Sequence, residues 1–400
     1  MTELFAIIEA VEGISLGGER GEDAWRTLDY IPGRQLRGAL AAAHRLLRPE
    51  ATEEFDRWFT TLTVSDAYPI DGDWSGDGAA IPFVRVLPRT TMSCKDSPRL
   101  GLSSESEGHP IRDDLIPSLL FVLDGQRRPD VFATGGTCQV CKAPLERLSG
   151  YLVEHGRRRW RASPKREVRA HVGISRSRGG AFPGILFARQ NLVAGTRFLA
   201  TFQIDDELAD ALREFLDDAA SAGVLRVGSS RSRGLGALRV TGPFHRSPPP
   251  APLAERLDRF NHVLRAEAAR LDVTLGPAWY LPITLLSDAI VVDDLFRPCG
   301  QLTSTWLREA AGIEGTLALA SASLRLTTGW NDLIGLPREV TPAIERGSVF
   351  VFELATPPSD ESLGRLQRLE SDGIGEERAV GFGAIRIADP IHLEFQKEVR

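Results

Sequence analysis

Alternating apolar and polar positions predict strands in both halves of the chain. Residues 4–16 read LFAIIEAVEGISL, which is typical of an opening strand. The segments ALRV at 237–240 and AIRI at 384–387 alternate in the same way. A further strand or hairpin pattern, YLPITLLSDAIVVDD, follows Trp279.

Apolar residues at helical spacing predict two helices. The first follows Pro32, which suits a helix start because its missing N–H costs nothing there. Its predicted core positions are Leu36, Leu40, Ala43 and Leu47. The second, LAERLDRFNHVLRAEAARL, follows the semi-rigid spacer SPPPAP at 247–252. We therefore predict a first domain at 1–246, a linker and helix at 247–276 and a second domain at 277–400.

Two glycine-rich segments, one in each half, repeat each other. Residues 227–244 read VGSSRSRGLGALRVTGPF, and residues 374–391 read IGEERAVGFGAIRIADPI. The identical positions are Gly228 and Gly375, Arg231 and Arg378, Gly234 and Gly381, Gly236 and Gly383, Ala237 and Ala384, Arg239 and Arg386, and Pro243 and Pro390. The repeat predicts a duplicated domain. Each loop is either a tight turn into a strand or a concave anion site that suits a phosphate.

Length, charge and composition narrow the class of protein. With 400 residues, 42% of them hydrophobic, two domains are the default. The net charge of −6 argues against a free-standing nucleic-acid binder but leaves room for a local basic groove. The start of the chain lacks a basic leader, no apolar run reaches the roughly 20 residues of a membrane span, and four cysteines make no disulfide framework. We expect a cytoplasmic protein with no membrane partner.

The basic groove is predicted at residues 155–178, where nine of 24 residues are Lys or Arg. Trp160 lies among these arginines and can stack on a base or pack beneath guanidinium groups. The alternative is a solvated hairpin edge. The preferred phosphate contacts are Lys165, Arg166, Arg169, Arg176 and Arg178. A second arginine stripe on the first helix (Arg34, Arg37, Arg45 and Arg48) is either a solvated face or a helix start that meets a phosphate.

Cysteines predict a zinc site. Cys138 and Cys141 form a Cys-x-x-Cys pair, whose spacing lets both thiolates bind one ion. With Cys94 and His109 they would complete a closed, structural tetrahedral site, and Cys299 is a reserve ligand. A metal would supply folding energy to a region, 88–150, that is poor in periodic pattern. The alternative is a pair of ordinary or redox-active cysteines.

The run Ile31-Pro32-Gly33-Arg34-Gln35-Leu36-Arg37-Gly38-Ala39-Leu40 resembles the first helix entry of the RAMP (repeat-associated mysterious protein) superfamily, with Gln35 where serine is frequent. The loops at 228–236 and 375–383 resemble its glycine-rich loop, and the blocks at 169–176, 184–187 and 195–198 are similar to its central strands. The blocks are spread over nearly the whole chain. The resemblance implies an α+β fold of tandem ferredoxin-like (RRM/RAMP-type) domains with antiparallel sheets and a zinc-bearing insertion at about 88–165.

Within that superfamily, the chain looks like the handle-binding (Cas-five-like, Csx-ten) subunit of type III-D CRISPR effector complexes. The tandem domains, the cysteine-bearing insertion, Trp330-Asn331 and the run at 347–350 carry this likeness. It implies a non-catalytic subunit that binds the 5′ handle of the CRISPR guide RNA and caps the complex beside the large signalling subunit, with other RAMP subunits as neighbours. The implied RNA contacts are Arg34, Arg37, Gly228, Ser229, Arg231, Arg233, Gly234 and Arg378.

Two other functions stay open. RAMP backbone subunits cleave target RNA with an aspartate in the loop before the first helix, where this chain has Asp23 and Asp29. A guide-processing ribonuclease would need a general base, and His44 and His171 have no partner evident in the sequence. The negative net charge favours a zinc-stabilised scaffold that contacts only proteins, whereas the basic segment opposes it. We assign no catalytic residue.

Overall fold

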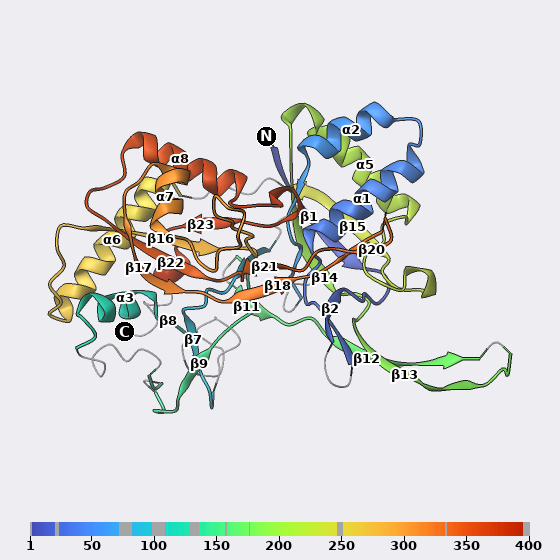
Figure 1. Ribbon diagram of the computed structural model, residues 1–400, viewed down its shortest axis with the longest axis horizontal. Coiled ribbons are helices and arrows are strands. Elements are labelled where there is room, and N and C mark those ends of the chain that lie inside the picture. Colours follow the sequence, from blue (N-terminus) through green and yellow to red (C-terminus); the bar gives the residue numbers. More distant parts are fainter. Residues whose placement is uncertain are drawn as a thin grey trace.

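The computed structural model describes residues 2–20, 24–71, 82–97, 109, 111–127, 136–138, 140–156, 158–175, 177–245, 251–332 and 334–394. Figure 1 shows two helix-covered sheets side by side, with a long hairpin that projects from the body.

The first half contains a βαββαβ unit. Its strands are β1 (Thr2–Ala10), β4 (Thr63–Val64), β14 (Arg197–Ile204) and β15 (Leu238–His245), and its helices are α1 (Gly33–Leu47), α2 (Thr52–Thr61) and α5 (Ala209–Ala222). The strands lie in the order β15-β1-β14-β4 with antiparallel neighbours, and the short β5 (Tyr68–Pro69) also pairs with β14. Numbered along the chain, this is the order 4-1-3-2 of a ferredoxin-like sheet. The apolar faces of α1 and α5 share its core.

The second half repeats this order. Its unit consists of β16 (Trp279–Leu285), α7 (Ser304–Ala311), β17 (Thr316–Ser321), β22 (Val349–Leu354), α8 (Asp360–Asp372) and β23 (Ile385–Ile387). The antiparallel sheet reads β17-β22-β16-β23, which is again 4-1-3-2 from the other edge. The strand pairs β18 (Leu324–Thr327) with β21 (Thr341–Ile344), and β19 (Trp330–Asn331) with β20 (Leu336–Pro337), lie between β17 and β22 in the chain. The predicted α+β fold of tandem ferredoxin-like units is confirmed.

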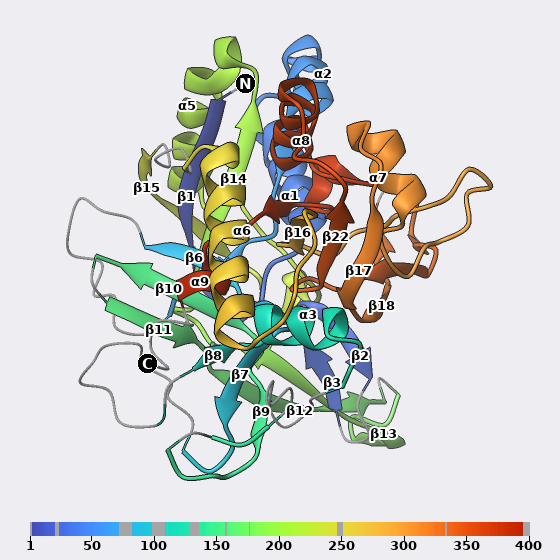
Figure 2. The same ribbon diagram turned by 90° about the vertical axis from the view of Figure 1, so that its left-hand side faces the viewer.

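The helix predicted as part of a linker belongs to the second core. This helix, α6 (Leu253–Arg270), buries Leu257, Phe260 and Leu264 in the same cluster as the strands of the second sheet. Another helix, α3 (Leu115–Leu123), joins that cluster although it comes from the first half. Figure 2 shows α3 crossing the foot of α6. The two halves therefore share one of their cores.

A large insertion separates β5 from β14. It holds the sheet of β6 (Phe83–Val86), β10 (Tyr151–His155) and β11 (Arg158–Ala162), and the sheet of β7 (Thr91–Cys94), β8 (Arg112–Asp113) and β9 (Leu145–Arg147). It ends in the hairpin of β12 (Arg166–Ile174) and β13 (Ala181–Leu192), which pairs with β3 (Ala24–Thr27) and then β2 (Gly17–Arg20). The insertion thus runs over 70–196, beyond the predicted 88–165.

A buried arginine joins the two halves. Arg346 donates to both carboxylate oxygens of Asp288, at 2.8 and 3.1 Å, and its guanidinium lies 3.3 Å from the Asp66 carboxylate of the first half. The guanidinium also lies 3.7 Å from the ring centroid of Tyr30. Burial raises the pKa of Asp66 to about 6, although Arg346 and the N–H of Gly33 oppose this. Burial acts to raise the pKa of Asp288, but the charge and hydrogen bonds of Arg346 and the charge of Arg325 together outweigh burial and lower this pKa.

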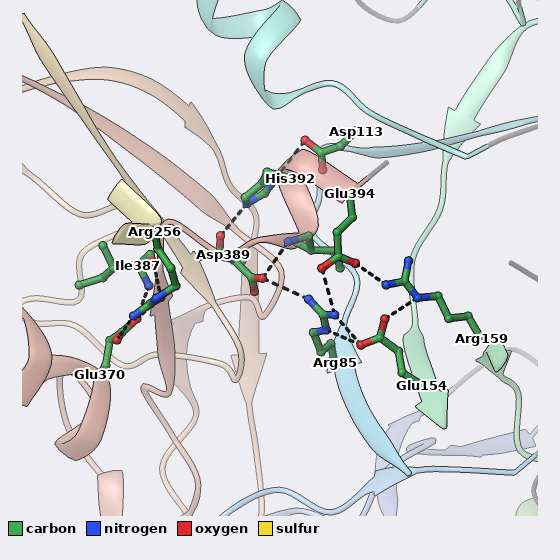
Figure 3. A network of polar contacts seen from close by, with 12 residues as sticks. Arg85, Asp113, Glu154, Arg159, Arg256, Glu370, Ile387, Asp389, His392 and Glu394 are labelled. Carbon is green, nitrogen blue, oxygen red and sulfur yellow. Dashed lines mark hydrogen bonds and ion pairs between the residues drawn. The ribbon is translucent and has the colours of Figure 1, made fainter. Parts of the chain in front are cut away.

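The C-terminal helix α9 (Ile391–Glu394) is a second junction between the halves. The His392 ring lies 3.1 Å from Asp113 of the insertion and 2.9 Å from the Thr284 hydroxyl, and it is completely buried. Burial opposes a charge on His392, but the Asp113 carboxylate outweighs it and raises the pKa. Figure 3 shows the adjoining network, in which Arg85 and Arg159 reach Glu394.

Among the described residues, no helix combines the length and apolar character needed to cross a bilayer.

Candidate functional site

The first glycine-rich loop has a backbone that requires glycine at several of its positions. It contains Ser230 in the left-handed region, the 3-10 turn Arg231–Arg233 and left-handed Gly234. Gly228 and Gly236 also have positive φ angles, and a Cβ on either would overlap a carbonyl oxygen of the chain beside it. Turns that alternate right- and left-handed residues point backbone N–H groups into one concavity, which favours an anion.

The second loop has the same backbone. Its 3-10 turn is Arg378–Val380, preceded by left-handed Glu377 and followed by left-handed Gly381. Matching hydrogen bonds from backbone N–H to backbone carbonyl fix both loops. In the first loop, they run from Val227 to Gly236, Ser229 to Ser15, Gly236 to Gly13 and Arg233 to Ser230. In the second loop, the corresponding bonds run from Ile374 to Gly383, Glu376 to Ile290, Gly383 to Asp288 and Val380 to Glu377. The sequence repeat is therefore a structural repeat.

The two loops differ in what surrounds them. Glu376 and Glu377 stand where the first loop has Ser229 and Ser230. The second loop packs on the start of α1, since Glu377 lies 2.5 Å from the Arg34 guanidinium. That guanidinium also lies over the ring of Phe382, and its side chain is only 12% exposed. The second loop thus acts as an internal contact and carries two carboxylates, which disfavour a phosphate.

The start of α1 is also engaged within the chain. The N–H of Gly33, which a helix start can offer to a phosphate, donates to Asp66 at 2.9 Å. Arg37 donates to the carbonyl oxygens of Leu62, at 3.2 Å, and Phe59. Arg34 and Arg37 were predicted as RNA contacts, but the structure gives both of them partners in the protein.

The first loop faces outward and meets the projecting hairpin. Ser229, Arg231 and Arg233 are exposed, and the Arg231 guanidinium lies 2.6 Å from the Asp332 carboxylate of the second half. Arg189 of β13 donates from Nη1 to the hydroxyls of Ser229 and Ser230, at 2.8 Å each. Sequence reasoning missed Arg189, because this residue lies 40 residues from the loop and outside the basic segment. The pairing of β12 with β13 brings Arg189 beside the basic residues of β12.

Most of the predicted basic contacts lie on or beside the hairpin, which Figure 1 shows extending away from the body. Lys165, Arg166, Arg169 and Arg178 are exposed, and Arg176 lies outside the described residues. Trp160 is different. Its side chain is 5% exposed, packs with the core of the insertion and donates from Nε1 to the carbonyl of Asp71. Trp160 is therefore a core residue, which has no face open to a base.

Of the two candidate catalytic aspartates, Asp29 lies among the described residues and has partners within the protein. Asp29 accepts a hydrogen bond from the Tyr151 hydroxyl at 3.0 Å and lies 3.8 Å from Arg166. It belongs to none of the metal-binding groups found among the described residues. Asp23 lies outside those residues. His44 packs beside Glu54 in the first core, and the His171 ring stacks on Phe187.

The four predicted metal ligands come together. The Sγ atoms of Cys94, Cys138 and Cys141 and a ring nitrogen of His109 all lie within 4.8 Å of one another. Nδ1 of His109 is 3.3 Å from the sulfurs of Cys94 and Cys138, and the sulfurs of Cys94 and Cys141 are 3.5 Å apart. The reserve ligand, Cys299, is not in this group.

This cluster fits a tetrahedral ion. Zinc–sulfur bonds of about 2.3 Å at tetrahedral angles place two sulfurs about 3.8 Å apart, close to the 3.5 Å between the sulfurs of Cys94 and Cys141. Burial opposes ionisation of Cys138, but hydrogen bonds from the backbone N–H groups of Cys141 and Val140 outweigh it and lower the pKa of the thiol. Four protein ligands leave no open position, so an ion here would be structural.

Comparisons with known proteins add the following findings. A sequence profile described as the RAMP superfamily matches residues 17–239. No curated protein matches the chain. The type III-B Cmr-beta structure bound to cognate target RNA and AMPPnP is 11% identical, with a TM-score of 0.38 over 87% of this chain and 86% of that one. Two more Cmr-beta structures, one with target RNA and one apo, have TM-scores of 0.32 and 0.31 at 11% identity, over 60% of this chain and 96% of theirs.

Proposed function

Since the profile spans more than half of its residues, this chain belongs to the RAMP superfamily, and on this premise we propose that it is a non-catalytic RNA-binding subunit of a type III CRISPR effector ribonucleoprotein. The observation that carries the proposal is the contact of Arg189 with Ser229 and Ser230. It brings the exposed glycine-rich loop and the basic hairpin to one surface, although the chain as a whole is negative.

This surface has the composition of a phosphate-binding site. Arg231 and Arg233 belong to a loop whose alternation of right- and left-handed residues is the backbone type that can hold an anion. Gly228 and Gly234 allow that backbone, and Ser229 adds a hydroxyl. Arg166, Arg169 and Arg178 extend the positive charge along the hairpin. Phosphate contacts of this kind set affinity and position without reading sequence.

The finer role follows the resemblance to handle-binding subunits. We propose that the RNA is the 5′ handle of the guide, and that the subunit caps the complex beside the large signalling subunit. The Cys94, His109, Cys138 and Cys141 group would hold zinc, which ties β7 to the loop before β9 and keeps the insertion folded. Zinc supplies no chemistry to the RNA in this proposal.

The test is binding of an end-labelled, repeat-containing RNA to purified protein, with and without Mg²⁺. The variants are Arg231→Glu and Arg189→Glu, with Arg297→Glu as control, because Arg297 is 71% exposed in the second half and pairs only locally with Asp293. We expect both site variants to lose affinity by about ten-fold or more and to reduce the salt dependence by about one phosphate contact each. Arg297→Glu should bind as the wild type does.

The other outcomes assign other functions. Cleavage that requires Mg²⁺ and disappears in Asp29→Ala would make the protein a nuclease. Tight binding that none of the substitutions weakens would move the RNA to another surface. No binding of the intact protein to any repeat-containing RNA would favour the scaffold that contacts only proteins.

A further inference from the structure

A short arm of the second half reaches the first glycine-rich loop. The arm, residues 328–340, leaves β18, forms the hairpin of β19 and β20, and returns to β21. At the turn of this hairpin, the carboxylate of Asp332 lies 2.6 Å from the guanidinium of Arg231. Nearer the base of the arm, a Cβ added to Gly329 would lie 3.2 Å from the Arg34 guanidinium of α1. Figure 1 accordingly shows β20 among the elements of the first half.

The arm lies outside the hydrophobic cores. Among its described residues, none is buried and none belongs to a core cluster. Its hairpin consists of two residue pairs, Trp330 with Pro337 and Asn331 with Leu336. A two-stranded hairpin that packs on no core is marginally stable in water. The strand that follows is firmly anchored, because Ile344 of β21 is completely buried. The arm can therefore shift while its base stays in place.

Asp332 binds the same guanidinium that the proposed RNA phosphate would need. Carboxylates and phosphates both present oxygens to the donors of a guanidinium, so the two groups compete for it. The pair is accessible to solvent, because the side chains of Arg231 and Asp332 are 43% and 64% exposed. Exposed ion pairs contribute little stability, so an incoming phosphate can replace the carboxylate.

We infer that Asp332 is an intramolecular competitor of RNA, which covers Arg231 in the free protein and leaves it when a phosphate binds. This inference rests on the RNA binding proposed above and adds a regulating residue to that site. Removing the carboxylate should strengthen RNA binding, because the RNA no longer has to displace it. The gain should require Arg231, and it should shrink as salt is raised, since salt screens an exposed ion pair.

The experiment measures the affinity of the intact protein for single-stranded, repeat-containing RNA in a double-mutant cycle. The variants are Asp332→Asn, Arg231→Gln and the two together. Asp210→Asn is the matched control, because it removes the same charge from a side chain that is 95% exposed and pairs locally with Arg213. We expect Asp332→Asn to tighten binding by about 2- to 5-fold, the contribution of one exposed ion pair. In the Arg231→Gln background, Asp332→Asn should have no effect beyond that of the control.

The outcomes separate the inference from the function on which it rests. If Arg231→Gln weakens binding but Asp332→Asn binds as the wild type does, or gains equally with and without Arg231, the inference is overturned and the RNA-binding function stands. If Arg231→Gln binds as tightly as the wild type, the RNA lies on another surface and Asp332 does not compete with it. If none of the proteins binds RNA, the proposed function fails and the inference fails with it.

Discussion

Replacing Arg346 with methionine should destabilise the protein by about 3–5 kcal/mol, the usual cost of removing one partner from a buried charge network. The side chains of Arg346, Asp66 and Asp288 are 9%, 8% and 5% exposed. Methionine leaves both carboxylates without this counter-ion, and it also removes the cation from the face of Tyr30. Because the carboxylates lie on different halves, the loss should weaken the junction as a whole.

The pH dependence makes this reasoning specific. Without Arg346, burial should raise the pKa values of both carboxyl groups above the value of about 3.9 in an unfolded chain. A raised pKa in the folded state means that stability is retained at low pH and lost as the pH rises through that pKa. The destabilisation by Arg346→Met should therefore be smaller at pH 5 than at pH 7.5. Adding Asp288→Asn should recover part of the loss.

The assay is urea unfolding followed by tryptophan fluorescence at both pH values. Arg297→Met is the matched control, because its ion pair with Asp293 is exposed and should contribute less than about 1 kcal/mol. Equal losses for Arg346→Met and Arg297→Met would refute the account of a buried network. A loss that does not change between pH 5 and pH 7.5 would refute the claim that unpaired carboxylates cause it.

Further predictions concern the second loop, the metal cluster and the C-terminal junction. Gly383→Ala should cost at least about 3 kcal/mol, because a Cβ there overlaps a backbone oxygen at a φ of +77°, whereas Gly364→Ala in open space on α8 should stabilise by up to about 1 kcal/mol; urea unfolding that ranks them otherwise contradicts the loop geometry. A zinc chelator should lower the thermal midpoint of the wild type and of Cys299→Ser but leave Cys141→Ser unchanged, and equal shifts in all three would argue against this ligand set. The wild type should lose stability as the pH rises above 6.5 through the raised pKa of His392, with a slope of up to about 1.4 kcal/mol per pH unit that His392→Gln abolishes; parallel pH profiles would show that His392 does not carry the proton.

Local signals in the sequence were enough for much of the architecture. The helix after Pro32 and the helix at 253–271 appear as α1 and α6 within a residue of prediction, because a 3.6-residue period is set by neighbouring positions. The glycine repeat correctly predicted two loops of the same backbone conformation. Its positions are fixed by clashes with adjacent backbone, which no other residue type avoids. The candidate metal ligands were found because cysteine and histidine are rare enough to be grouped by elimination and spacing.

RNA contacts were predicted in both duplicated loops, five residues in the first and Arg378 in the second, and tertiary structure shows how differently the two loops are placed. One faces outward beside Arg189, while the other is closed against Arg34 by Glu377. Trp160 illustrates the same limit, since an indole among arginines is buried by strands that come from elsewhere in the insertion. Exposure depends on what the rest of the chain packs over a residue, and a local pattern does not contain that information.

The sequence by itself thus indicated a duplicated domain, the glycine-dependent loops and a candidate group of metal ligands, because these rest on a repeat, steric restriction and ligand chemistry. The ferredoxin-like topology came from the family resemblance. Tertiary structure decided which loop faces outward and which residues line the surface beside it. Trp25 and Arg189 are 164 residues apart in the chain and adjacent on the sheet only because β3 pairs with β13. Strand pairing over such a distance is selected by the packing of the whole fold, so no window of sequence reveals it.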